Sequence, residues 1–339
     1  MIPAAGIYLP TALRCFYGRR TGTFADMRIV STTKPHVTVV GNSTIELAHP
    51  VPRIPDSGDV IYSGEIKDRP GSKAPRISLN LAAMGCRVFL LTCVGMDSQG
   101  ANILRDLKSG GVNTDFIERT EDAPTGITHA FTDPCDNIAR IVTRGAGMEM
   151  TVEPLLASKA MLSSSQLMIL LPDIPPDVFS FAIRAAHHFR VPVLVPASPP
   201  GSLDKNLIKD IDILLTNSDE AECLSKVRPV DIESSNEVLN YMLSSGAGAA
   251  VLYLGANGAA VSMETGKTHI VPAPKSEGIF RLDAENCFAS AFALHLMKGR
   301  AMHEAATYAC AASTASAIRG PNGGLPEKPE ILRLLNINM

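Results

Sequence analysis

Short apolar runs recur along this chain, and each has the length and composition of a strand buried on both faces. They lie at residues 36–41, 88–94, 167–171, 191–195, 211–215 and 250–254. Stretches with helical apolar spacing separate them, at residues 77–84, 100–109, 176–187, 218–225 and 237–244. This alternation predicts an α/β fold in which a mostly parallel sheet lies between helices. In such folds the ligand binds at the carboxyl ends of the strands.

Two segments, at about residues 47–69 and 126–144, interrupt this alternation with short polar and apolar patterns, as at 60–64 and 127–131. They predict short strands outside the main sheet, which would form a small β lid that excludes water from the ligand. After residue 283 the sequence predicts helix to about residue 319, a turn at 320–324 and a short helix from Lys328. Residues 36–335 are therefore expected to form one domain.

Composition narrows the function. The chain has 339 residues, 45% of them hydrophobic, which is enough for a substantial core. Its formal net charge is −3 and it has no run rich in Lys or Arg, so we expect a small-molecule ligand and neither nucleic acid nor membrane. The seven cysteines include no C-x-x-C pair, which argues against disulfides and a zinc site and favours the reducing cytoplasm.

Residues 1–35 precede the first predicted strand and contain several arginines but a single acid, Asp26. We expect a poorly ordered extension, or an upstream start with Met27 as the true first residue. A targeting segment is the alternative, because such segments are rich in Arg and poor in acids.

A glycine turn precedes the first predicted helix. Pro70-Gly71-Ser72-Lys73 is followed by a small-residue stretch at 77–85, and then by Val94-Gly95-Met96-Asp97 with a glycine at position 100. Such a turn lets backbone N–H groups approach a polyhydroxyl ligand. Taken alone, it is more simply an ordinary strand-to-helix turn.

Two further motifs follow predicted strands. Asn217-Ser218-Asp219-Glu220 opens a helix, where the Glu can organise Mg²⁺ through water, or where Asn217 and Glu220 can form a capping box. Gly255-Ala256-Asn257-Gly258 predicts a turn between strands.

In this order, over about residues 37–332, these motifs resemble those of the ribokinase-like (PfkB) carbohydrate kinases, which carry P-G-G-x-x-x-N, N-x-x-E and G-x-x-G. The resemblance implies a ribokinase-like fold that transfers the γ-phosphate of ATP, with Mg²⁺, to a primary hydroxyl of a sugar or nucleoside. The wording of residues 77–85 is closer to the pseudouridine kinase branch.

The resemblance also implies roles for single residues. Those that would frame the substrate are Glu46, Gly71, Ser72, Lys73, Arg76 and Asp173. Those that would hold the nucleotide are Asn217, Glu220, Gly255, Gly258 and Cys310, with Glu220 also binding Mg²⁺ through water. For Cys310 the alternative is a core position, since a lone Cys on an apolar helix face is usually buried. Ser72 and Arg76 depart from the family's second Gly and its sugar-binding Asn.

The segment 280–294 departs furthest. The family reads D-T-x-G-A-G-D here, and its last Asp takes the proton from the attacking hydroxyl. This chain has Asn286 at that position, Glu285 for the preceding Gly, and Phe280-Arg281 for the leading Asp-Thr, which removes an expected monovalent-cation site. An amide is no base, and a carboxylate beside a transferring phosphate opposes its charge.

Other side chains could compensate. Asp283 could serve as the base, although a helix N-cap is the simpler interpretation, and Arg281 or Arg76 could stabilise phosphate.

Two functions remain open. The first is a kinase of low rate. The second is a pseudokinase that binds nucleotide, sugar or a protein partner without turnover. Asn286 and Glu285 favour the second, and the retained Asn217–Glu220 and Gly255–Gly258 motifs favour nucleotide binding in both. The resemblance further implies a homodimer formed through the lid.

Overall fold

The computed structural model describes residues 34–135, 137–276, 283–319 and 325–337. Residues 1–33 of the predicted extension at 1–35, and the predicted turn at 320–324, lie outside these ranges. So do Phe280 and Arg281.

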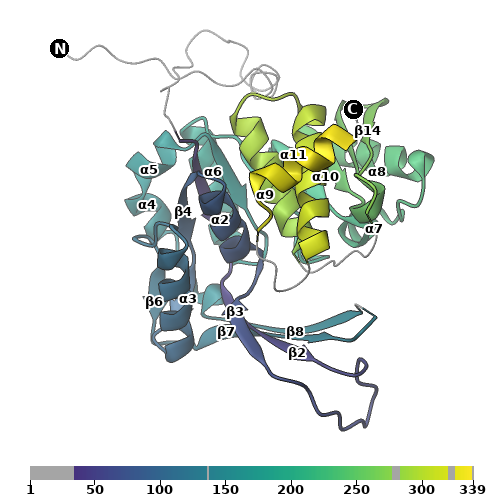
Figure 1. Cartoon of the computed structure of the whole chain (residues 1–339). Coiled ribbons are helices and arrows are strands. Elements are labelled where there is room, and N and C mark those ends of the chain that lie inside the picture. Colours follow the sequence, from purple (N-terminus) through teal and green to yellow (C-terminus); the bar gives the residue numbers. More distant parts are fainter. Residues whose placement is uncertain (1–33, 136, 277–282, 320–324, 338–339) are drawn as a thin grey trace, which may run out of the picture.

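A large sheet forms the centre of the molecule, and helices cover both of its faces (Figure 1). Its strand order is β14-β13-β12-β11-β10-β9-β1-β4. The parallel strands are β1 (His36–Val40), β4 (Arg87–Leu91), β9 (Leu167–Leu170), β10 (Val193–Pro196), β11 (Ile213–Thr216) and β12 (Ala249–Tyr253). These are the apolar runs of the sequence, so the predicted mostly parallel sheet is confirmed.

Two antiparallel strands at one edge were not predicted. They are β13 (Ala259–Glu264) and β14 (Lys267–Val271), a hairpin that continues from β12. The apolar run predicted at 88–94 divides into β4 and the short β5 (Cys93–Gly95), which pairs with β6 (Glu118–Thr120).

The helices bury two apolar layers, one on each face of the large sheet. The helices on one face are α2 (Lys73–Ala83), α3 (Ser98–Ser109), α9 (Ala284–Met297) and α10 (Met302–Arg319). Those on the other face include α4 (Glu153–Ala157), α5 (Lys159–Ser164), α6 (Pro176–His188), α7 (Ser218–Ser225) and α8 (Ile232–Ser244). The last helix is α11 (Lys328–Ile337).

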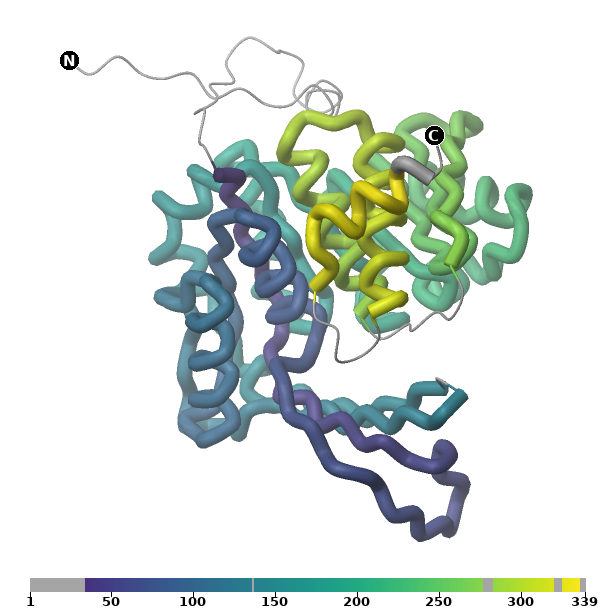
Figure 2. The backbone as a smooth tube through the Cα atoms, viewed as in Figure 1, coloured from purple at the N-terminus to yellow at the C-terminus, as the bar shows by residue number. Residues whose placement is uncertain are grey.

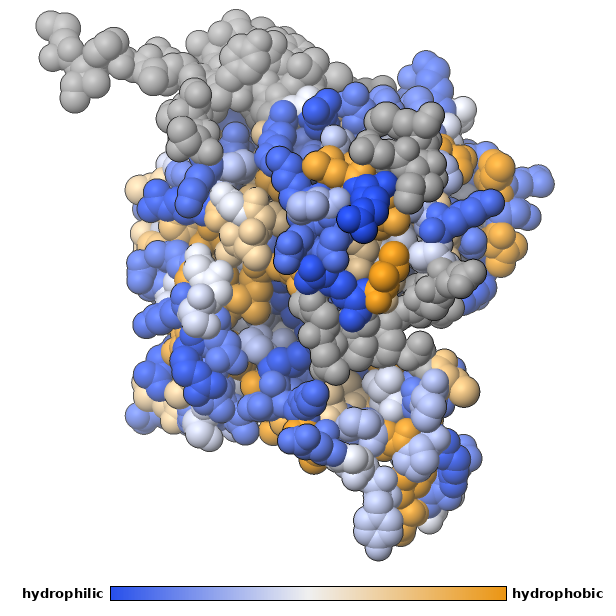
Figure 3. Space-filling model, viewed as in Figure 1, coloured by the Kyte–Doolittle hydropathy of each residue, from blue (hydrophilic) through white to orange (hydrophobic). Residues whose placement is uncertain are grey.

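The predicted helix after residue 283 is two helices, because the chain turns back at Gly299, whose φ is 84°. Both are rich in alanine, and α9 also buries the rings of Phe288 and Phe292 completely. None of the helices in the described ranges is both long and apolar enough to cross a membrane. The face of the molecule in Figure 3 is mostly hydrophilic, with apolar residues in small groups.

A second, smaller sheet projects from the first (Figure 2). Its strands, in spatial order, are β3 (Lys67–Pro70), β2 (Thr44–Pro50), β7 (Thr125–Thr132) and β8 (Ile138–Gly145). The predicted segments thus do supply strands outside the main sheet. However, residues 60–64 are not a strand. The Gly64 backbone N–H donates to the Pro50 carbonyl at 2.8 Å, but no ladder continues from this bond, and Val60 and Tyr62 are 85% and 89% exposed.

Candidate active site

A cavity of about 630 Å³ lies where the large and small sheets meet. From the large sheet and its helices, it is lined by residues that follow strands or begin helices: Asn42, Ser72, Lys73, Arg76, Asp173, Ser198, Pro199, Pro200, Asn217, Asp219, Glu220, Glu285 and Asn286. From the small sheet it is lined by Glu46, Thr128, Arg140, Val142 and Arg144. We call this cavity the cleft.

One cation joins two acidic motifs across the cleft. Lys73, at the start of α2, places Nζ 3.2 Å from Glu220 Oε1 and also forms an ion pair with Glu285. Asn217 Nδ2 donates to the same Glu285 oxygen at 3.2 Å. The glycine turn, the Asn217–Glu220 motif and the altered catalytic segment therefore meet at one point.

The Asn217–Glu220 motif is also the predicted capping box. Asn217 Oδ1 accepts from the Glu220 backbone N–H, and Glu220 Oε2 accepts from the Asn217 backbone N–H, both at 2.9 Å. Glu220 is 1% exposed, and this burial raises its pKa, as does the charge of Glu285, while Lys73 opposes the shift. For Lys73 burial alone would lower the pKa, but the two carboxylates outweigh it and the net shift is upward.

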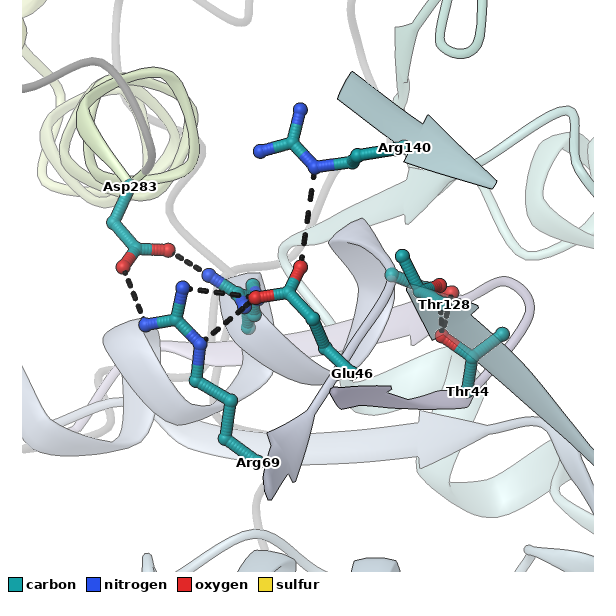
Figure 4. Close-up of polar contacts among 8 residues, drawn as sticks. Thr44, Glu46, Arg69, Thr128, Arg140 and Asp283 are labelled. Carbon is teal, nitrogen blue, oxygen red and sulfur yellow. Dashed lines mark hydrogen bonds and ion pairs between the residues drawn. The ribbon is translucent and has the colours of Figure 1, made fainter. Parts of the chain in front are cut away.

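A second charge network surrounds Glu46 (Figure 4). Arg69 Nε donates to Glu46 Oε1 at 2.9 Å, and Arg76 Nη2 donates to the same oxygen at 2.6 Å. Both arginines also pair with Asp283, Arg69 at 3.1 Å. The Glu46 side chain is 4% exposed, so its carboxylate is engaged within the protein.

Asp283 occupies the N-cap position of α9, as the simpler interpretation predicted, but its side chain makes no capping hydrogen bond. It binds Arg69 and Arg76 instead. Both of its carboxylate oxygens are thus engaged by guanidinium groups.

Asn286, at the family's base position, lies in the first turn of α9 and is 6% exposed. Among the described residues its Oδ1 has no hydrogen-bond partner, although it lines the cleft. Glu285, at the glycine position of the family motif, directs its carboxylate to Lys73.

Ser72 has a backbone conformation that favours glycine, the residue of the family motif at this position. Its φ and ψ are 61° and 166°, and its hydroxyl lies 3.0 Å from Thr44 Oγ1. Gly71 does not line the cleft but packs against the small sheet, since a Cβ there would lie 2.6 Å from Thr44 Oγ1.

Asp173, beyond the end of β9, accepts a hydrogen bond from the Asn42 backbone N–H at 3.1 Å. Burial raises its pKa to about 6, although Asn42, Arg144 and Lys73 act in the opposite direction. None of the described residues forms an ion pair with Asp173.

Three predicted nucleotide residues lie outside the cleft. Gly255 begins the 3₁₀ turn Gly255–Asn257 between β12 and β13, and nothing lies within 4 Å of the Cβ it would carry. Gly258 closes this turn. Cys310 is 1% exposed in the core of α10, where burial raises its thiol pKa to about 12.

Sequence reasoning missed Asn42, Arg140 and Arg144, which also line the cleft. The two arginines alternate with Val142 on one face of β8, and alternation along a strand is the signal that could have found them. Nothing in the sequence indicates that this face turns toward the cleft.

A model of the pfkB family carbohydrate kinases matches residues 34–324, which is most of the chain. The protein belongs to this family. The ribokinase of Bacillus subtilis is 24% identical over 303 residues, which cover 89% of this chain and 99% of that protein. The ribokinase of Staphylococcus aureus is 28% identical and covers 78% of this chain and 87% of its own.

Solved structures give the same fold. A ribokinase from Giardia lamblia superposes with a TM-score of 0.81 at 18% identity, and covers 88% of this chain and 99% of its own. The ribokinase of Arabidopsis thaliana, complexed with ribose and ATP, has a TM-score of 0.78 at 21% identity, and covers 89% and 99%. The ribokinase-like fold inferred from the motifs is therefore confirmed.

Proposed function

We propose that this PfkB-family protein is a kinase that transfers the γ-phosphate of ATP to a primary hydroxyl of a sugar or nucleoside, at a low rate. The observation that carries the proposal is the single cleft in which the glycine turn, the Asn217–Glu220 motif and the start of α9 meet. These segments lie far apart in sequence, and the family relationship supports the same use for each.

The cleft fits the nucleotide and the metal in part. The Arabidopsis relative was solved with ATP, which supports ATP here. Gly255, which lies outside the cleft, presents open backbone. Lys73 offers a cation for phosphate, but it is already paired with Glu285. The Glu220 carboxylate accepts from Lys73, from the Asn217 backbone and from Ser198. Mg²⁺ keeps much of its water shell, so a contact through water is the mode that suits this occupied carboxylate. When bound, ATP and Mg²⁺ supply the phosphoryl group and neutralise its charge.

The low rate follows from the catalytic segment. Asn286 accepts no proton, and losing a general base costs roughly 10²–10⁴ in rate. Glu285 must also release Lys73 before that cation can serve a phosphate group.

The second candidate, a pseudokinase, is favoured by the ion pair of Glu285 with Lys73, because a protein carboxylate then takes the place of a substrate anion. It would bind nucleotide, sugar or a protein partner without turnover.

A coupled ADP-release assay over sugars and nucleosides distinguishes the two. We expect slow turnover by the wild type and faster turnover by Glu285→Gly/Asn286→Asp, by roughly 10²-fold or more as the base returns. Nucleotide affinity is measured in parallel by calorimetry. Binding of ATP with no turnover on any acceptor would establish the pseudokinase instead.

We also propose that the small sheet acts as the lid. Its exposed apolar side chains Ile141 and Val142, at 63% and 52% exposure, support contact with another surface, and the homodimer through this sheet stays a prediction.

A further inference from the structure

Two arginines of the small sheet line the cleft and make few polar contacts with the described residues. Arg140 and Arg144 both line the cleft from β8. Arg140 Nε lies 3.9 Å from Glu46 Oε2, at the limit of an ion pair, and its side chain is 41% exposed. Figure 4 shows its two terminal nitrogens turned away from Glu46.

Arg144 forms no ion pair with any residue that the structure describes. Its Nη1 lies 3.9 Å from Met148 Sδ, which is a weak acceptor at most. An arginine carries five N–H donors in a planar fork suited to carboxylate or phosphate, so this position offers unfilled recognition capacity.

The carboxylates of the cleft are mostly engaged elsewhere. Glu46 accepts from Arg69 and Arg76, and Glu220 and Glu285 share Lys73. Asp219 pairs with Arg228 at 3.1 Å on the outside. Asp173 remains, and it lies on the opposite wall, close enough to Arg144 for their charges to interact.

An acceptor for hydroxyl groups stands beside these arginines. The Asp173 carboxylate lines the cleft, and among the described residues its one donor outside its own residue is the Asn42 backbone N–H at 3.1 Å. Asn42 in turn holds the start of this wall in place, because its Nδ2 donates to the Arg144 carbonyl at 3.3 Å while its Oδ1 packs against Gly147.

We infer that the acceptor molecule is a polyol that carries a carboxylate or phosphate group, and that Arg140 and Arg144 bind this group while Asp173 binds its hydroxyls. This inference deepens the proposed function and rests on it. Glu46, which the family resemblance assigns to sugar hydroxyls, is here neutralised by two guanidinium groups, so the cleft is better suited to an anionic polyol than to a neutral sugar.

Calorimetry with matched ligands tests the inference without turnover. Gluconate is compared with glucose, ribonate with ribose, and glucose 1-phosphate with both classes to separate carboxylate from phosphate. We expect the anionic member to bind roughly ten-fold or more tightly than the neutral one, the value of a charge-assisted hydrogen bond. Raising the salt concentration should weaken only the anionic ligands.

Arg140→Gln and Arg144→Gln should each remove most of that preference and leave the neutral ligand unchanged. Arg105→Gln is the matched control, because Arg105 is 67% exposed on α3 and, among the residues that the structure describes, bonds only to its own helix. Circular dichroism verifies the fold of each variant, and the salt series on the wild type keeps the test valid if a variant fails to fold.

Equal binding of neutral and anionic ligands by the wild type would overturn the inference. So would a loss of ATP affinity in the arginine variants with gluconate binding intact, because the arginines would then serve the nucleotide. If the wild type shows the predicted binding preference but none of the acceptors leads to ADP release, the ligand class stands and the proposed kinase activity fails. If it phosphorylates neutral sugars as well as anionic ones, the activity stands and the inference fails.

Discussion

Ser72 has a backbone conformation that is unfavourable for a residue with a side chain. Its φ of 61° with ψ of 166° lies in a region that glycine adopts freely and that costs other residues about 1–3 kcal/mol. Glycine, which the family motif carries at this position, would adopt this conformation without that cost.

We expect Ser72→Gly to have a higher free energy of unfolding than Ser72→Ala, by about 1 kcal/mol or more. Both variants lose the hydroxyl contact with Thr44, but only glycine relieves the backbone. Urea unfolding of the two variants measures the difference. Equal stabilities would show that the turn relaxes in solution.

The raised pKa of Asp173 should make the stability of the protein depend on pH. Its pKa is raised from 3.8 to about 6, chiefly by burial, so the folded state holds a proton that the unfolded state has already released. Stability contributed by this group is therefore present below pH 3.8 and is lost as the pH rises to about 6.

Asp173→Asn should remove this dependence and raise the free energy of unfolding at neutral pH by at most about 3 kcal/mol, at about 1.4 kcal/mol per pKa unit. Unfolding curves of both proteins across that pH interval provide the measurement. A difference between them that stays constant with pH would contradict the raised pKa.

At the scale of elements, local signals set some boundaries well. Helix α7 has the bounds the sequence predicted, because Asn217 and Glu220 cap it. The hairpin of β13 and β14 was missed, since its strands lie at an edge where the pattern is mixed: β14 is exposed at three of its five positions. Residues 60–64 alternate as a strand does, but the backbone bond from Gly64 to Pro50 does not extend into a ladder.

The turn between β12 and β13 contains two glycines with different requirements. A Cβ on Gly258, at φ 92°, would lie 2.0 Å from the Val271 carbonyl oxygen, whereas one on Gly255, at φ 60°, meets nothing. Gly255→Ala should lower the free energy of unfolding by about 1–2 kcal/mol, the cost of the left-handed conformation.

Gly258→Ala should lower it by at least about 2 kcal/mol more, because the hairpin must shift as well. Thermal or urea unfolding of the pair gives the comparison. Similar losses in the two variants would mean that β14 moves aside freely.

At the scale of the whole molecule, Asp283 joins parts that are distant in sequence. It ties the start of α9 to Arg69 of the small sheet and Arg76 of α2. Without the charge of Asp283, Glu46 would be the one carboxylate left to balance Arg69 and Arg76 among their described partners.

Because Asp283 is 34% exposed, we expect Asp283→Asn to cost about 2 kcal/mol, between the values of exposed and buried pairs. Hydrogen exchange in β3 should speed up as the small sheet loosens. Asp56→Asn is the control, since Asp56 is 91% exposed and pairs with Arg53 alone among the described residues, and it should change neither quantity. Unchanged exchange in β3 would show that Asp283 does not hold the sheet.

The sequence by itself determined the parallel sheet, the family, and nine of the eighteen residues that line the cleft. Apolar runs and helix caps are local, and motif order persists even where single residues change. Only the tertiary structure decided how the charges pair: Lys73 with Glu285, Glu46 with two arginines, and Arg140 and Arg144 left facing the cleft. Pairing depends on which side chains approach within a few ångströms across segments distant in sequence, and no local pattern records that distance.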